Sequence, residues 1–148
     1  MNKAEIAANS FMPINCAQAV LTAYAADYGL EKDKALQVAA AFGSGMGRLQ
    51  ETCGAVSGAL IVLGLSSGFK EKDCENIIEI RNTIYAKTRD LISDFTEEKK
   101  SVLCRELLGC ECDLKTEEGR KFYNDNNLQE KCRDFIRLAC KLTEKHSF

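Results

Sequence analysis

The 148-residue chain lacks several features that would point to familiar functions. It has no tryptophan, one proline and one histidine, and its most apolar run, 54–65, is shorter than the roughly 20 residues that cross a bilayer. The N-terminal residues 1–6 lack the apolar stretch of a secretion signal. We therefore expect a cytoplasmic protein without membrane insertion.

The charge of the chain argues against another class of partner. Twenty Lys and Arg residues stand against 22 Asp and Glu residues, for a net charge of −2, and the two signs are mixed along the sequence. Because no basic block occurs, we expect no nucleic-acid binding. An apolar fraction of 45% with only 10 glycines indicates a folded protein, and the length suits one domain over residues 1–148.

Helical periodicity runs through almost every segment, and no stretch alternates convincingly at period two. We predict an all-α fold, a compact bundle of about seven helices. Asn15 is a good cap for a helix that begins at Cys16, and Asp73 caps the longest predicted helix, which ends near Phe95. The predicted helix over 51–63 is rich in Ala, Gly and Ser, so that other backbones can approach it closely. We expect this helix to be buried at the centre.

Cysteine, by contrast, is abundant, with eight residues. In a reducing compartment, this number favours redox or metal chemistry over a framework of structural disulfides. No C-x-x-C occurs, which argues against a thioredoxin-type motif and ordinary zinc ribbons. Five cysteines lie within about one turn of a predicted helix start, where the helix dipole acts, and apart from Cys74 we take them as candidate site residues. These candidates are Cys16, Cys53, Cys104 and Cys132.

Cys53 has the placement that most favours a reactive thiol. It follows a glycine segment, 43–47, and Arg48, and it opens an apolar helix. A helix N-terminus and a neighbouring cation both lower a thiol pKa, and the thiolate is the form that attacks disulfides or binds metal. We predict that Cys53 is the attacking thiolate, activated by its helix start and by Arg48. Glu51 is a candidate proton acceptor, although we consider it more simply as a carboxylate that stabilises the first turn of a helix.

The other cysteines and the single histidine carry less information. Cys140 lies beside an apolar helical stripe and is expected in the core, whereas Cys74 is expected to be exposed and incidental. Cys110 and Cys112 form a C-x-C in a loop, which could hold a metal or a strained disulfide, and their role stays open. His146 lies in a tail that we expect to fray, so it is a poor metal ligand.

A series of motifs along the chain is similar to a known family. In order, they are Asn15-Cys16-Ala17-Gln18-Ala19-Val20-Leu21, Tyr28-Gly29-Leu30, Gly45-Met46-Gly47-Arg48, Cys53-Gly54-Ala55-Val56-Ser57-Gly58-Ala59-Leu60, Cys104-Arg105-Glu106-Leu107-Leu108-Gly109, Thr116-Glu117-Glu118-Gly119 and Cys132. With them the chain resembles, over nearly its whole length, the bacterial and archaeal redox-active family C_GCAxxG_C_C. That name abbreviates four cysteines and a CGAxxG motif.

The resemblance implies that the four defining cysteines are Cys16, Cys53, Cys104 and Cys132, and it favours redox chemistry over simple packing. The chain departs from the usual pattern at residues 13–14, where proline and isoleucine replace a glycine-aromatic pair. The two cysteines of the C-x-C are also additional.

Three functions remain open on the sequence. The first is a thiol–disulfide oxidoreductase or electron carrier, in which a second family cysteine resolves the mixed disulfide formed with a redox partner protein or a small thiol. The second is a metal protein with the same four cysteines as ligands to zinc, iron or an iron–sulfur cluster. The third is a helical binding module without chemistry. Apolar residues on the long helix also suggest a homodimer.

Overall fold

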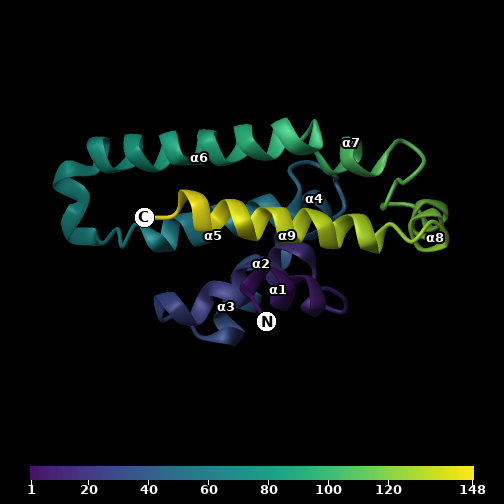
Figure 1. The fold of residues 1–148 in the computed structure, drawn as a ribbon, viewed down its shortest axis with the longest axis horizontal. Helices are drawn as coiled ribbons and strands as arrows, with labels where there is room; N and C mark the ends of the chain where they lie inside the picture. Colours follow the sequence, from purple (N-terminus) through teal and green to yellow (C-terminus); the bar gives the residue numbers. More distant parts are fainter.

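The computed structural model describes all residues, Met1–Phe148, and confirms the all-α prediction (Figure 1). It contains eight right-handed α-helices, against about seven predicted. Their bounds are α1 Lys3–Ser10, α2 Cys16–Tyr24, α3 Lys32–Ala39, α5 Gly54–Ser66, α6 Ile77–Lys99, α7 Cys104–Leu108, α8 Glu117–Asp125 and α9 Gln129–His146. Three 3-10 segments, Ala25–Tyr28, Ala40–Phe42 and Glu71–Asn76, and the short element α4, Gly43–Met46, complete the chain.

The core is built around α5, which packs between α2 and α9. Most residues of its first two turns are buried, and among them are Gly54, Ala55, Val56, Gly58 and Ala59. This confirms the predicted buried, Ala/Gly-rich central helix, because small side chains let two other helices approach its backbone. In Figure 1, α1, α2 and α3 lie on one side of α5 and α9, and α6 lies along the other.

The longest helix is held to the core by its second half. In α6, only Leu91 and Phe95 are buried, and Asp94 reaches α9, where its carboxylate lies 2.8 Å from Lys145 Nζ and 2.7 Å from His146 Nε2. The tail was therefore wrongly expected to fray, since α9 runs through His146 and this ion pair fixes its last turn.

The starts of the helices decide where the cysteines lie. The predicted α2 start is confirmed, but α5 begins at Gly54 rather than near Glu51. The preceding segment is extended, with Cys53 N donating to Val102 O at 2.7 Å and Cys104 N donating to Glu51 O at 2.7 Å. Those long-range hydrogen bonds compete with the first helical turn and make Cys53 the N-cap residue.

The final helix begins earlier than predicted. It starts at Gln129, so Cys132 ends the first turn of α9 and does not begin it. The shift leaves the cysteine within the part of the helix where the dipole acts. None of the helices combines the length and the apolar character needed to span a membrane.

Candidate functional site: a cavity lined by four thiols

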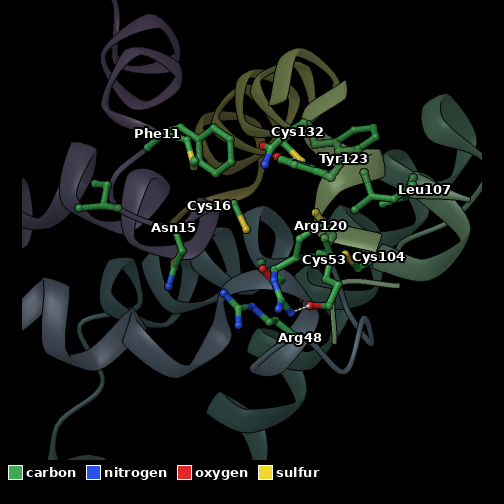
Figure 2. Close-up of a pocket in the computed structure, with 18 of the residues that line it drawn as sticks. Phe11, Asn15, Cys16, Arg48, Cys53, Cys104, Leu107, Arg120, Tyr123 and Cys132 are labelled. Atoms are coloured by element: carbon green, nitrogen blue, oxygen red, sulfur yellow. Dashed lines mark hydrogen bonds between the residues drawn. The ribbon is translucent and has the colours of Figure 1, made fainter. Parts of the chain in front are cut away.

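All four candidate cysteines line one cavity of about 380 Å³, which we call the thiol cavity (Figure 2). They come from four helix starts that are remote in sequence, those of α2, α5, α7 and α9. Arg48, Arg120 and Tyr123 also line it, together with apolar side chains that include Phe11 and Phe135. The fold thus gathers Cys16, Cys53, Cys104 and Cys132 around a common space.

The position of Cys16 is set by the capping of α2. Asn15 Oδ1 accepts from Gln18 N, and Gln18 Oε1 accepts from Asn15 N, both at 2.9 Å, which makes a reciprocal capping box. Asn15 Nδ2 also donates to Ala40 O at 3.0 Å. A Cβ on Gly43 would lie 2.5 Å from the Asn15 side chain, so glycine is needed there. The cap therefore ties the start of α2 to the chain just before α4.

The glycines of the CGAxxG motif explain how α2 meets α5. A Cβ on Gly54 would lie 2.3 Å from Cys16 Sγ, and one on Gly58 would lie 2.7 Å from Ala17 O. Real side chains do not approach so closely, so both positions exclude every residue with a Cβ unless the helices move apart. The sulfur of Cys16 consequently sits against the first residue of α5, directly after Cys53.

Cys53 and Cys104 are brought together by two short extended segments. Thr52 and Leu103 form an antiparallel bridge, and each of the two cysteines follows a bridged residue. Because successive side chains of an extended chain alternate between faces, both cysteines point to the same face of this pair of segments. A Cβ on Gly45 would lie 2.8 Å from Cys104 Cβ, so the glycine segment packs directly against this cysteine.

The glycine segment forms a left-handed turn. Residues 44–48 all have positive φ, between 54° and 70°, although three of them are not glycine. Left-handed backbone costs an ordinary residue roughly 1–2 kcal/mol, so the surrounding contacts must hold this turn in place. It carries Arg48 to the cavity and places the backbone N–H of Ser44 near the sulfur of Cys16.

The thiol of Cys16 experiences opposing effects. Burial raises its pKa, whereas the backbone N–H groups of Ser44, Ala17, Cys16 itself and Gly54 lower it. Burial is the larger effect, so the thiol is protonated at neutral pH. These N–H groups nonetheless act on the thiol in the direction expected at a helix start.

The predicted lowering of the Cys53 pKa is wrong. Cys53 is 6% exposed, and its burial raises the pKa of the thiol well above the usual value, with a further contribution from the nearby Cys16. The N–H groups of Val56 and Ala55 lower the pKa as a helix start should, but by less than burial raises it. Arg48 lines the cavity but is not among the groups that shift this pKa.

Cys104 and Cys132 are protonated for the same reason. Burial raises the pKa of each thiol to about 12. Tyr123 Oη donates to Cys132 Sγ at 3.3 Å, which lowers the pKa of that thiol but does not offset burial. The cavity therefore holds four neutral thiols in its reduced state.

Glu51 lies outside the thiol cavity. Its carboxylate forms an exposed ion pair with Arg105, at 3.1 Å, and it does not contribute to the cavity wall. A role as proton acceptor for Cys53 therefore finds no support in the geometry.

The order and spacing of these motifs agree with one family. The family model described as "Putative redox-active protein (C_GCAxxG_C_C)" matches residues 14–146. The chain belongs to this C_GCAxxG_C_C family. No curated protein and no solved structure matches the chain. For this C_GCAxxG_C_C protein, the structure adds that Cys16, Cys53, Cys104 and Cys132 line one cavity and that Gly54 and Gly58 let α2 approach the start of α5 closely.

Two cavity residues of this C_GCAxxG_C_C protein were missed at the sequence level. Arg120 and Tyr123 project from α8, a helix that carries none of the four cysteines. Their spacing of three places them on one helical face, but nothing in the sequence says which helix that face meets. Arg120 Nη1 donates to Leu114 O at 2.9 Å, which holds its guanidinium at the cavity wall.

The two extra cysteines lie in different surroundings. Cys112 is 1% exposed, and its Sγ donates to Gly119 O at 3.8 Å, whereas Cys110 is exposed. Buried Gln50 secures the loop, with Nε2 donating to Cys112 O at 2.8 Å and Oε1 accepting from Leu114 N at 2.9 Å. As expected, Cys140 is in the core and Cys74 is exposed.

The thiols stand around the cavity without converging on one point. All eight cysteines are free, and no three Cys, His, Asp or Glu side chains are grouped closely enough to hold a metal ion. The donor geometry that zinc or an iron–sulfur cluster requires, four sulfur atoms about one centre, is not formed by Cys16, Cys53, Cys104 and Cys132.

Proposed function

We propose that this protein is a thiol–disulfide redox protein in which Cys16 attacks a disulfide and Cys53 resolves the product. The observation that carries the proposal is the contact of Cys16 Sγ with Gly54, the residue that follows Cys53 in the sequence, in a cavity that four thiols line. Cys16 is partly exposed and Cys53 is 6% exposed, so an incoming disulfide meets Cys16 first. The sequence suggested Cys53 as the attacking thiol, and this proposal assigns that role to Cys16 instead.

The reaction has two exchange steps. The Cys16 thiolate attacks one sulfur of a disulfide, forms a mixed disulfide and releases one thiolate. The Cys53 thiolate then attacks Cys16 Sγ, forms a Cys16–Cys53 disulfide and releases the second thiolate. Two protein thiols are oxidised, one disulfide is reduced to two thiols, and the two protons lost by the protein pass to the released thiolates or to water.

The backbone donors around Cys16 support its role as the attacking group. The backbone N–H groups of Ser44, Ala17 and Gly54 lower the pKa of this thiol, so they favour the negative charge that forms on the sulfur during attack. Since burial raises the pKa of this thiol, only a small fraction is thiolate at neutral pH. We expect the rate of exchange to rise with pH up to and beyond pH 9.

The proposal is tested by trapping the mixed disulfide. In the Cys53→Ala variant, a neutral disulfide such as bis(2-hydroxyethyl) disulfide should leave a stable adduct on Cys16, detected by mass spectrometry of peptides. The wild type should instead accumulate the Cys16–Cys53 disulfide. The matched control is Cys140→Ala, which removes a buried thiol away from the cavity and should behave as the wild type.

Two results would contradict the proposal. Absence of any adduct at Cys16 in the Cys53→Ala variant would remove Cys16 as the attacking group. Stoichiometric zinc or iron in the protein purified without oxygen, lost when any of the four cysteines is replaced, would support the metal alternative.

A further inference from the structure

The wall of the thiol cavity carries positive charge and no negative charge. Its 19 lining residues include two arginines, Arg48 and Arg120, and no aspartate or glutamate. This is unlike the chain as a whole, which has 22 acidic residues against 20 basic ones. The four thiols are neutral when reduced, so they do not balance the arginines. The cavity is therefore an electropositive site on an acidic protein.

The two arginines are free to bind a ligand. Arg105, Arg133 and Arg137 each form an ion pair with a carboxylate, but neither Arg48 nor Arg120 does. Figure 2 shows both cavity arginines on the same side of the cavity, below Cys16 in this view. A guanidinium without a carboxylate partner at the wall of a cavity is suited to bind one, and it can do so through two parallel hydrogen bonds.

The fold holds one of the two guanidinium groups in place and leaves the other exposed at the cavity wall. Arg120 is half-buried and is held through its bond to Leu114 O at 2.9 Å. Arg48 is exposed and ends the left-handed turn, with φ of 70°, which brings this arginine to the cavity wall.

The remaining wall and the volume limit the size of the ligand. Apolar side chains, among them Phe11, Leu107 and Phe135, line other parts of the cavity. A volume of about 380 Å³ lies at the small end of the range of roughly 300–1,000 Å³ that holds small molecules. The site thus suits a short carbon chain with charged ends better than a folded protein surface.

We propose that the substrate is a small disulfide that carries carboxylates, bound by Arg48 and Arg120 with its sulfur–sulfur bond at Cys16. This inference rests on the proposed function, since it names the substrate class of the same site. Attack by Cys16 releases one carboxylate-bearing thiolate, and attack by Cys53 releases the other. Each half of the substrate thus leaves with its own negative charge.

Three disulfides of similar length test the preference for charge. They are 3,3′-dithiodipropionate, which is negatively charged, bis(2-hydroxyethyl) disulfide, which is neutral, and cystamine, which is positively charged. For each disulfide, the rate of adduct formation at Cys16 in Cys53→Ala is divided by the rate at which the same disulfide reacts with a free small thiol. This ratio should be highest for the dianion. We expect the dianion to exceed the neutral disulfide by about tenfold, and the excess to shrink with added salt.

Arginine variants locate the preference. Arg48→Gln and Arg120→Gln should each reduce the ratio of dianion to neutral rates by about threefold, so that the two arginines together account for the tenfold preference. The matched control is Arg105→Gln, whose guanidinium pairs with Glu51 outside the cavity and should leave the ratio unchanged. Equal ratios for wild type and both cavity variants would overturn the inference while leaving the proposed function intact.

A binding measurement separates the two proposals further. Adipate, a dicarboxylate of similar length without sulfur, should slow alkylation of Cys16 by neutral iodoacetamide, and 1,6-hexanediol should not. Protection by adipate that is lost in Arg48→Gln and Arg120→Gln supports the anion site even if no disulfide reacts. Equal effects of adipate and the diol would refute it.

Discussion

At the scale of single residues, the site depends on what glycine leaves out. A Cβ on Gly54 would lie 2.3 Å from Cys16 Sγ and 2.9 Å from Phe42 O, so only glycine leaves room for the sulfur there. Gly64, in the same helix, has nothing within 4 Å of where its Cβ would be. The two positions therefore separate a packing role of glycine from its effect on helix propensity.

We predict opposite effects for alanine at these two glycines. Gly54→Ala should lower the free energy of unfolding by about 1–3 kcal/mol, because the added carbon overlaps Cys16 Sγ and must push α2 away. It should also alter the alkylation rate of Cys16. Gly64→Ala should raise the free energy of unfolding by about 0.5–1 kcal/mol through helix propensity.

Chemical denaturation of the two variants and of the wild type checks the prediction. Equal effects at both positions would mean that the close approach of Cys16 to Gly54 does not constrain the fold.

At the scale of elements, the site is an assembly of helix starts. The capping box at Asn15 fixes where α2 begins, and therefore where its first residue, Cys16, projects. Asn2 caps α1 by accepting from Glu5 N at 2.9 Å, but nothing in α1 lines the thiol cavity. These two caps are matched in residue type, but only the cap at Asn15 directly precedes a cysteine of the site.

We predict that the two caps affect stability alike and the site differently. Asn15→Ala and Asn2→Ala should each lower the free energy of unfolding by about 0.5–2 kcal/mol, with the larger loss at Asn15, which also donates to Ala40 O. Only Asn15→Ala should change the alkylation rate of Cys16, because only this cap orients that thiol. Parallel denaturation and alkylation experiments test both parts, and a change in Cys16 reactivity in Asn2→Ala would contradict them.

At the scale of the whole molecule, burial of thiols links stability to pH. Burial raises the pKa of Cys104, Cys132 and Cys140 to about 12, whereas cysteines in an unfolded chain titrate at about 8.5. Below that value both states hold the protons, and stability is complete. Above it the unfolded chain loses protons that the folded protein retains, which favours unfolding until the pH passes the folded pKa.

We predict that the reduced protein loses stability as the pH rises from 8 to 10. Once the pH exceeds the unfolded pKa, each such thiol contributes up to roughly 1.4 kcal/mol per pH unit. Urea denaturation under reducing, oxygen-free conditions should show this decrease in the free energy of unfolding. In Cys140→Ala, the decrease should be smaller by the contribution of one thiol. Stability that is constant or rises over this interval would show that the cysteines are not buried as described.

The first half of α6 leaves a different feature on the molecular surface. Ile77, Ile78 and Tyr85 are 40%, 64% and 54% exposed. The sequence placed apolar residues on this helix and so suggested a homodimer, which stays a prediction that the molar mass in solution can test. The fold itself needs only the second half of α6, where Leu91 and Phe95 enter the core.

Local signals in the sequence determined the helices and the choice of cysteines. Periodicity and caps such as Asn15 and Thr116 depend on neighbours along the chain, so they predicted the all-α fold, the buried central helix and the cysteines at helix starts. The exact start of α5 was missed because long-range hydrogen bonds from Cys53 and Cys104 hold residues 51–53 in an extended form.

Only the tertiary structure decided the electrostatics of the site. The dipole of a helix start is local, and the sequence therefore suggested a lowered pKa for Cys53. Burial depends on segments far away along the chain, and for this thiol it outweighs the dipole. The same holds for Arg120, which reaches the cavity because α8 folds back over it. The sequence identified the four cysteines, whereas tertiary packing determines their protonation and the charges around them.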